Sequence, residues 1–369
     1  MSNVDSLFAP FDGGSLKVSN RVVMAPMTRS SSPGNVPNEK VVEYYRRRAA
    51  GGVGLIITEG TCVGHQAANG YPNVPFIHGD EALAGWKKVV DAVHAEGGKI
   101  APQLWHVGAI RRPGTEPDPE VPGYGPSGMA KPGKKTGHEM SKEDIADVVA
   151  AFAKAAKDAK DVGFDAVEIH GAHGYLVDQF FWEGTNQRTD EYGGSLENRS
   201  RFAIEIIKAI RAEVGPDFPI ILRWSQWKQQ EYTARLVETP EALEQFLAPL
   251  SEAGVDIFHC STRRFWEPEF EGSDLNLAGW TKKITGKPTI TVGSVGLNAD
   301  FLSDPNFAGF SEGQPASIDN LLQRLDNDEF DLVAVGRALI TNPDWANKIK
   351  EGKSDELKAF AKEALFNLD

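Results

Sequence analysis

The chain has 369 residues, of which 41% are hydrophobic and 25% are charged, and its formal net charge is −13. This composition is typical of a soluble globular protein, and the acidic balance argues against a nucleic-acid surface and against electrostatic binding to anionic membranes. Two cysteines exclude a disulfide framework, and no signal peptide or membrane-spanning stretch is visible. We therefore expect a cytoplasmic protein.

Short apolar runs alternate with amphipathic segments along the whole chain. The runs that predict buried strands are residues 21–28, 54–60, 99–106, 166–169, 219–224, 255–260, 287–293 and 330–337. Helical patterns occupy residues 38–50, 80–96, 141–162, 196–214, 239–253 and 317–325, and the segment from residue 343 is mostly helical. Eight such strands alternating with helices predict an α/β protein, a (β/α)8 TIM barrel that forms a single domain over residues 1–369.

Two segments are expected to decorate this barrel. Residues 7–18 contain two glycines between short apolar runs and predict an N-terminal hairpin. Residues 107–140 follow the third strand, are rich in proline and glycine, and lack periodicity. A connection of this length predicts a functional cap or lid rather than core. Residues 263–283 form a second, looser connection.

An open doubly wound sheet is the alternative fold. It would place a glycine-rich dinucleotide loop after the first strand. The residues found there are Ala25, Pro26, Met27 and Thr28, which do not form such a loop. The barrel is therefore favoured.

The most unusual residues follow the fourth predicted strand. There His170, His173 and Tyr175 lie within six residues, separated by glycines that let the backbone turn sharply. Two imidazoles can donate hydrogen bonds to a carbonyl oxygen, and a phenol can supply a proton. Because a barrel places its active site at the carboxyl ends of its strands, this group predicts a catalytic site.

The other strand ends add hydrogen-bond donors and glycines, with almost no carboxylates. These residues are Thr28, Gly60, Gln103, Trp105, His106, Arg223, Gly293, Ser294, Gly296, Gly336 and Arg337. Such a rim does not suit an acid–base hydrolase or a divalent-cation enzyme. The glycines and Arg337 after the last two strands favour a phosphate site. Arg223, if it faces the interior, requires an anionic partner such as a bound ring or phosphate.

Several runs along the chain form a recognisable set, at residues 21–28, 57–60, 103–106, 170–176, 186–199 and 335–337. Taken together, they resemble the old yellow enzymes, which are flavin-dependent ene reductases. The resemblance covers nearly the whole chain in order, and the run 186–199 is its most specific part. It implies a TIM barrel that holds FMN noncovalently.

The resemblance also assigns residues to roles. The isoalloxazine would be lined by Pro26, Met27, Thr28, Gly60, Gln103 and Arg223. The phosphate end would be held by Gly293, Ser294, Gly336 and Arg337. His170 and His173 would bind the electron-withdrawing oxygen of the substrate, and Tyr175 would be the proton donor.

The implied reaction has two halves. NADPH or NADH would reduce the flavin, which would then transfer hydride to the β-carbon of an activated alkene, an α,β-unsaturated carbonyl or nitro compound. No metal is expected, and the iron–sulfur site and second nucleotide domain of the multidomain relatives are expected to be absent. The substrate, the preferred nicotinamide, and the choice between monomer and homodimer stay open.

Two other functional classes are compatible with the residues. A zinc-dependent barrel lyase or hydrolase could use His106, His170 and His173, although the rim offers no carboxylate to complete or orient such a site. A ligand-binding barrel could hold FMN without turnover. A visible spectrum with a metal assay distinguishes the zinc enzyme from a flavin reductase. NAD(P)H oxidation in the presence of cyclohexenone distinguishes a flavin reductase from a barrel that only binds FMN.

Overall fold

A closed barrel of eight parallel strands forms the centre of the computed structural model, which describes residues 3–300 and 311–368. The strands follow one another around the barrel in the order β10-β11-β12-β13-β14-β3-β4-β5. They are β3 (Val22–Met24), β4 (Leu55–Cys62), β5 (Lys99–Trp105), β10 (Val167–His173), β11 (Ile220–Lys228), β12 (Ile257–Ser261), β13 (Thr289–Val292) and β14 (Leu332–Val335). The (β/α)8 barrel expected from the sequence is confirmed.

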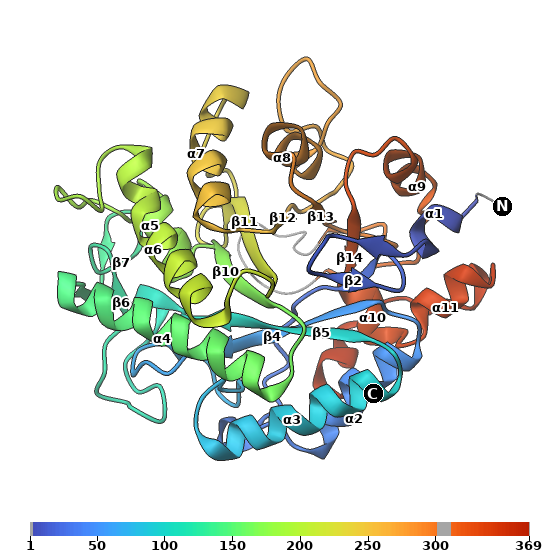
Figure 1. Ribbon diagram of the computed structural model, residues 1–369, viewed down its shortest axis with the longest axis horizontal. Coiled ribbons are helices and arrows are strands. Elements are labelled where there is room, and N and C mark those ends of the chain that lie inside the picture. Colours follow the sequence, from blue (N-terminus) through green and yellow to red (C-terminus); the bar gives the residue numbers. More distant parts are fainter. Residues whose placement is uncertain (1–2, 301–310, 369) are drawn as a thin grey trace.

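Helices surround the strands (Figure 1). The longer ones are α2 (Glu39–Ala50), α3 (Asp80–Ala95), α4 (Lys142–Val162), α6 (Leu196–Val214), α7 (Pro240–Ala253), α8 (Leu277–Thr285) and α9 (Asp319–Asp326). The shorter ones are α1 (Asp5–Phe8), α5 (Leu176–Phe181), α10 (Arg337–Thr341) and α11 (Trp345–Lys350). Short 3-10 turns are η1 (Pro33–Asn35), η2 (Gly108–Ile110), η3 (Ser354–Glu356) and η4 (Lys362–Phe366).

Local sequence sets the starts of two of these helices. Ser141 accepts a hydrogen bond from the Asp144 backbone N–H and forms a capping box at α4. Thr239 caps α7 directly before Pro240, whose missing N–H costs nothing at the first helical position.

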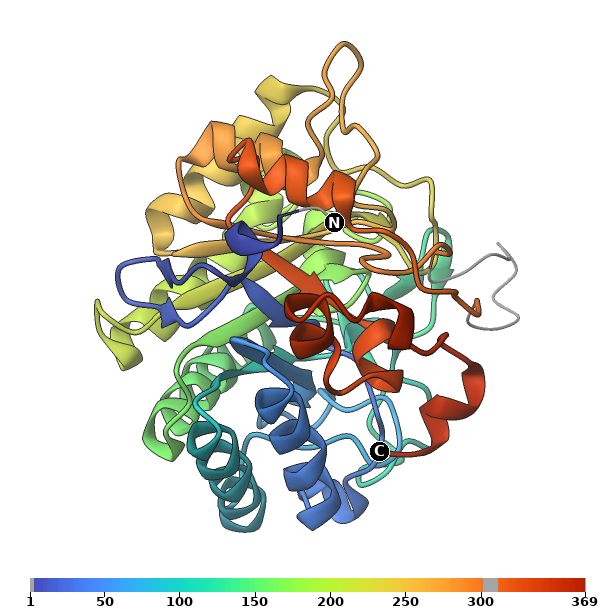
Figure 2. The same ribbon diagram turned by 90° about the vertical axis from the view of Figure 1, so that its right-hand side faces the viewer.

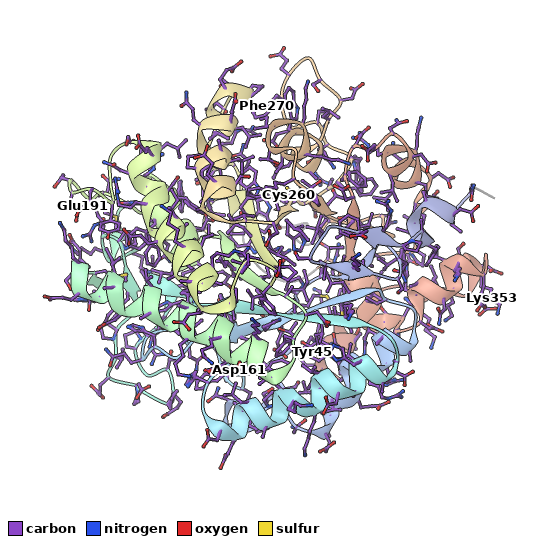
Figure 3. The ribbon with its side chains drawn as sticks, in the orientation of Figure 1. Tyr45, Asp161, Glu191, Cys260, Phe270 and Lys353 are labelled. Atoms are coloured by element: carbon purple, nitrogen blue, oxygen red, sulfur yellow. The ribbon has the colours of Figure 1, made fainter. Side chains whose placement is uncertain are left out.

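Charged residues such as Glu191 and Lys353 lie at the periphery of the molecule (Figure 3). None of the helices in the described ranges is both long enough and apolar enough to cross a bilayer.

The barrel interior changes from apolar to polar along four neighbouring strands. Ala101, Ala166, Ile221 and Ile257 belong to one apolar cluster inside the barrel. Side chains of a strand alternate between its two faces, so the residues two positions further along also face inward. These residues are Gln103, Glu168, Arg223 and His259, all buried. We call these four residues the polar layer; it lies toward the carboxyl ends of the strands.

An N-terminal hairpin packs against the other end of the barrel. β1 (Phe11–Asp12) pairs antiparallel with β2 (Lys17–Val18), and it lies at one end of the strands (Figure 2). Phe11, Leu16 and Val18 join the apolar cluster of the barrel interior. The hairpin therefore closes the amino end and leaves the carboxyl end for a ligand.

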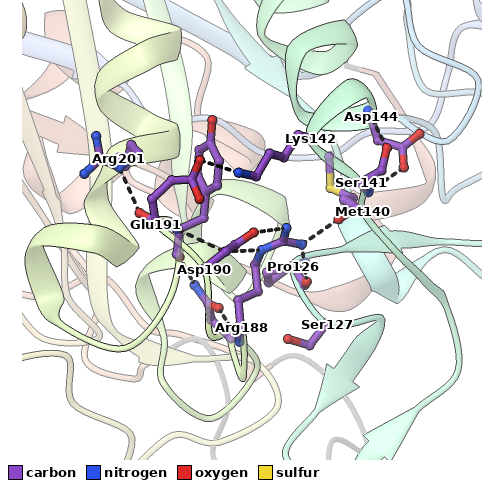
Figure 4. Close-up of polar contacts among 12 residues, drawn as sticks. Pro126, Ser127, Met140, Ser141, Lys142, Asp144, Arg188, Asp190, Glu191 and Arg201 are labelled. Carbon is purple, nitrogen blue, oxygen red and sulfur yellow. Dashed lines mark hydrogen bonds and ion pairs between the residues drawn. The ribbon is translucent and has the colours of Figure 1, made fainter.

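The insertion over residues 107–140 follows β5 and contains two small sheets. In one, β6 (Tyr124–Gly125) pairs with β9 (His138–Glu139), and in the other β7 (Met129–Lys131) pairs with β8 (Lys134–Lys135). Arg188 holds this insertion, donating hydrogen bonds to the carbonyl oxygens of Pro126 and Met140 at 2.9 and 2.5 Å (Figure 4). Asp190 pairs with the same guanidinium at 2.6 Å. The family-specific run 186–199 thus fastens the insertion to the barrel.

The boundaries expected from the sequence differ from the structure in a few places. The first strand ends at Met24 and not at residue 28, because Pro26 has no N–H to continue the ladder. The irregular connection expected over 263–283 already contains the start of α8. Three short helices, α1, α5 and α10, have no counterpart among the expected helices.

Candidate active site

His170 and His173 lie at the end of β10, which continues through both residues and does not stop at Ile169. The register against β11 shifts between Gly171 and His173, and His173 has a left-handed backbone with φ of 66°. That conformation is unfavourable for a residue with a β-carbon and is typical of functional sites. The two imidazole rings lie 5.2 Å apart at 89° to each other, and the side chains are 5% and 8% exposed.

Hydrogen bonds assign the tautomer of His170 and link that of His173 to the orientation of the Ser261 hydroxyl. The Ala172 backbone N–H donates to Nδ1 of His170 at 3.4 Å, so Nε2 of His170 carries the proton. Arg223 donates to Ser261 Oγ at 3.4 Å, and this hydroxyl lies 2.7 Å from Nε2 of His173. If the hydroxyl donates to Nε2, Nδ1 of His173 keeps the proton. Burial, reinforced by the Arg223 charge, lowers the pKa of both imidazoles well below the ordinary value. Both rings are therefore neutral near pH 7, and each carries a single N–H group.

Tyr175 follows these two residues and presents a buried hydroxyl. Its oxygen lies 3.1 Å from the Tyr71 hydroxyl, and Gln229 Nε2 donates to it at 3.1 Å. Its ring lies 4.9 Å from that of His170 and 5.0 Å from that of Trp105, on which Tyr71 is also stacked. Burial, followed by the neighbouring Tyr71, raises the pKa of Tyr175 well above its ordinary value. The phenol is therefore protonated at neutral pH and can act as an acid.

The polar layer lies deeper in the barrel. Glu168 accepts hydrogen bonds from Gln103 Nε2 at 2.9 Å and from His259 Nδ1 at 2.6 Å. Arg223 is 7% exposed, and its buried Nε has no hydrogen-bond partner in the described part of the chain. A buried guanidinium donor left unpaired is costly, which makes it a strong candidate contact for a bound acceptor.

The polar layer occupies only one side of the barrel. On β13, β14 and β3 the corresponding inward-facing residues are Val292, Ala334 and Ala25, which are small or apolar. A flavin ring has the same division, with carbonyl and N–H groups on its pyrimidine edge and methyl groups on the opposite edge. The residues present therefore fit FMN, and the unpaired Nε of Arg223 could donate a hydrogen bond to its pyrimidine edge.

The exit of β3 forms another part of the mouth. Pro26 and Met27 are half-buried and Thr28 is exposed. A β-carbon added at Gly336 would lie 3.6 Å from Met27 Sδ and would meet no closer atom. A methyl group at Gly336 would therefore sit in ordinary van der Waals contact with Met27, so protein packing alone does not require glycine there.

Two glycines of the predicted site are required by protein packing. A β-carbon at Gly60 would lie 2.4 Å from the Trp105 ring. A β-carbon at Gly293 would lie 2.7 Å from Thr262 Oγ1, and the φ of this glycine is 142°. Both positions exclude larger residues before any ligand is considered.

The predicted phosphate end holds a buried arginine. Arg337 donates to the carbonyl oxygens of Ala299, Asp300 and Ser311 at 2.5, 3.0 and 3.0 Å, and Ser294 Oγ donates to Ala299 at 3.1 Å. Burial lowers the pKa of Arg337 to about 10. No carboxylate within 3–300 and 311–368 forms an ion pair with this guanidinium. Three backbone carbonyl oxygens thus hold this guanidinium, and the charge of Asp300 partly offsets the effect of burial on its pKa.

The expectation of a rim almost without carboxylates is wrong. Glu168 lies in the polar layer, and Glu59 accepts hydrogen bonds from the backbone N–H groups that follow Thr28. Asp178 lies under the turn after His173 and pairs with Lys228 at 2.6 Å, both side chains being fully buried. Glu168 precedes His170 by two residues and so shares its strand face, a signal that the sequence contained. The Asp178 pair joins residues far apart in the chain and left no such signal.

Comparisons with known proteins show which family the chain belongs to. The profile of the NADH:flavin oxidoreductase / NADH oxidase family matches residues 6–303. The chain belongs to this family. This flavin oxidoreductase is 36% identical over 329 residues to 12-oxophytodienoate reductase 2 of Arabidopsis thaliana, covering 81% of the chain and 86% of that protein.

Two further relatives extend the comparison. NADH oxidase of Thermoanaerobacter brockii is 35% identical over 372 residues, which cover 97% of this chain but 52% of that longer protein. The solved structure of morphinone reductase in complex with tetrahydroNAD has a TM-score of 0.80 and 33% identity, covering 97% of this chain and 93% of that one. The resemblance to old yellow enzymes is confirmed, and with it an FMN-dependent ene reductase that uses a nicotinamide nucleotide.

The zinc alternative finds no support. Over the described ranges, no group of three or more His, Cys, Asp or Glu side chains could hold a metal ion. Nε2 of His106 is hydrogen-bonded to His65 at 3.0 Å, and its Nδ1 accepts a hydrogen bond from the Gly108 backbone N–H. His106 therefore has no free ring nitrogen to bind a metal ion together with His170 and His173.

Proposed function

We propose that this ene reductase reduces activated alkenes with His170, His173 and Tyr175 as its substrate-facing residues. The observation that supports the proposal is the convergence of two neutral N–H donors and one buried phenol at the end of β10. When bound, FMN supplies the redox chemistry, accepting hydride from NADPH or NADH and delivering it to the β-carbon of the alkene. The substrate class is an α,β-unsaturated carbonyl or nitro compound.

The two imidazoles bind and polarise the substrate. Nε2–H of His170 and Nδ1–H of His173 can both donate to one carbonyl or nitro oxygen. Negative charge grows on that oxygen during the reaction, so these bonds become stronger in the transition state than in the bound substrate. Each donor in a site of this kind typically contributes about 100-fold to 1,000-fold in rate.

Tyr175 gives its proton to the α-carbon of the alkene. The charge that develops on its oxygen is then stabilised by the N–H donor of Gln229 and by the hydroxyl of Tyr71. These two partners hold the Tyr175 hydroxyl in position.

The cofactor residues are carried from the family resemblance as part of the same proposal. The flavin ring is lined by Pro26, Met27, Thr28, Gly60, Gln103 and Arg223. The phosphate end is held by Gly293, Ser294, Gly336 and Arg337. The unpaired Nε of Arg223 supports the placement of the flavin ring. Residues 1–369 then form one FMN-binding domain.

Anaerobic rapid mixing tests the function. The oxidised holoenzyme is first reduced with NADH or NADPH, and the reduced enzyme is then mixed with 2-cyclohexenone while the flavin absorbance is followed. We expect the flavin to reoxidise, with saturated ketone formed in equal amount. A reduced enzyme that reacts with oxygen but not with alkenes would contradict the proposal.

A further inference from the structure

The polar layer contains a carboxylate for which the proposed reaction has no use. Glu168 is fully buried, and its two oxygens accept one hydrogen bond each, from Gln103 and from His259. Removing a carboxylate from water is costly unless donors and a positive charge compensate it. Its position among Gln103, Arg223 and His259 suggests a role toward the cofactor.

Glu168 fixes the orientation of the Gln103 side chain. A carboxylate only accepts hydrogen bonds, so the Gln103 group that faces it must be the NH₂ group. The amide oxygen of Gln103 is then left for a donor. The pyrimidine edge of a flavin carries one N–H, at N3, between its two carbonyl groups. Gln103 held in this way presents the acceptor that N3–H requires.

Glu168 also balances the charge of the polar layer. Arg223 brings one positive charge, and Glu168 lowers the cost of burying it. His259 uses Nδ1 toward Glu168, while its buried Nε2 has no partner in the described ranges. Burial lowers the pKa of His259, so this ring is neutral at pH 7. The layer therefore carries one positive and one negative charge.

We propose that Glu168 is a positioning residue that holds the Gln103 amide toward flavin N3 and limits the positive charge of Arg223, and so keeps the reduction potential of the bound flavin low. The inference depends on the proposed placement of the flavin against Gln103 and Arg223. Electrons added to the ring are attracted by Arg223 and repelled by Glu168. Removal of the carboxylate charge makes reduction easier.

The test compares holoenzymes with wild-type sequence, Glu168→Gln and Glu269→Gln. Glu269 is a matched control, since this largely buried carboxylate, like Glu168, accepts a hydrogen bond from a glutamine, Gln226 at 2.9 Å. It accepts another from Arg235 at 2.5 Å. Two quantities are measured: the midpoint potential of the flavin, and the Kd of sulfite, which binds oxidised flavins more tightly as their potential rises.

Glu168→Gln should raise the potential and tighten sulfite binding about tenfold, as expected for one unit charge acting across several ångströms of protein. Glu269→Gln should match the wild type in both measurements. A potential in Glu168→Gln equal to that of the wild type would overturn the proposal, as would an equal shift in the control.

Glu168→Asp separates position from charge. It keeps the carboxylate but withdraws it from Gln103, so FMN should dissociate more readily while the potential stays close to that of the wild type. If Glu168→Gln does not fold, Glu168→Asp still tests the positioning role of Glu168, because an unchanged FMN affinity would contradict that role. None of these measurements uses an alkene. A failure of alkene reduction would therefore refute the proposed function and leave these results interpretable.

Discussion

The hydroxyl oxygens of Tyr71 and Tyr175 lie 3.1 Å apart, and the Tyr71 ring is stacked on Trp105, whose ring also contacts Tyr175. Tyr71 comes from the loop after β4 and Tyr175 from the end of β10. The stacking fixes the Tyr71 hydroxyl beside the oxygen of the proposed acid. Tyr71 thus belongs to the candidate site, although no motif around it predicted this.

Tyr71→Phe tests this relationship. The variant removes one donor to the charge that develops on the Tyr175 oxygen, which should slow flavin reoxidation by an alkene about threefold to tenfold, the usual worth of one neutral hydrogen bond. Flavin reduction by the nicotinamide should not change. Tyr124→Phe is the matched control, since it removes a tyrosine hydroxyl that also accepts from a glutamine, Gln66 at 3.0 Å. Equal rates in the two variants would refute a role for Tyr71.

The imidazole pair predicts how the oxidised enzyme binds phenols. A phenolate oxygen can occupy the position of the substrate oxygen and accept from both His170 and His173, which should give a long-wavelength charge-transfer band with the flavin. The double variant His170→Ala, His173→Ala should lose this band and weaken phenol binding at least tenfold. Absorbance titration measures both. Retention of the band with wild-type affinity would show that neither imidazole anchors the ligand.

Glu59 predicts a dependence of stability on pH. Burial raises the pKa of Glu59 from 4.5 to about 7. Below pH 4.5 the carboxyl is protonated in the folded and unfolded states alike, whereas above pH 7 folding must bury a charge. The contribution of this group to stability therefore falls as the pH rises from about 4.5 to about 7.

Glu59→Gln removes the free-energy cost of burying the ionised carboxylate. The variant should be more stable than the wild type at pH 8, by up to about 3 kcal/mol, and the gain should shrink strongly at pH 5. Chemical unfolding of the holoenzyme at the two pH values measures the difference. Glu191→Gln, on the surface, serves as the control and should show no comparable change between the two pH values. A gain of equal size at pH 5 and pH 8 would exclude ionisation as the cause.

The buried pair of Asp178 and Lys228 predicts a large effect on stability. Asp178 also accepts from the Gly174 backbone N–H at 2.8 Å, so the pair supports the turn between His173 and Tyr175. Lys228→Met leaves an uncompensated buried carboxylate and should destabilise the fold by about 3–5 kcal/mol.

Lys157→Met provides the comparison for this variant. It breaks an exposed pair with Asp161 and should hardly change the unfolding midpoint. If the double variant Asp178→Leu, Lys228→Met recovers most of the lost stability, the unpaired Asp178 carboxylate is the cause of the destabilisation by Lys228→Met. A small effect of Lys228→Met alone would contradict this explanation.

The barrel could be predicted from the sequence because its strands are buried on both faces. Such strands appear as short apolar runs, and all eight lie where these runs occur. Helix ends with strong caps, such as Ser141 and Thr239, were also predictable. The helix α5 was not, because Leu176–Phe181 has fewer than two turns and begins without a side-chain cap.

The site was only partly predictable, for a physical reason. His170, His173 and Tyr175 are close in sequence, so one motif revealed them. Other contacts depend on how separate strands meet: Glu168 with His259, and Tyr71 with Tyr175, join residues about 100 positions apart. Only the folded barrel brings these side chains together.

The central claim is that Tyr175 supplies the proton for alkene reduction, and single-turnover kinetics of Tyr175→Phe test it most directly. The variant should be reduced by the nicotinamide at the wild-type rate, whereas reoxidation of its flavin by 2-cyclohexenone should slow by about 100-fold to 10,000-fold. Wild-type reoxidation in the variant, or an equal loss in both half-reactions, would contradict the account.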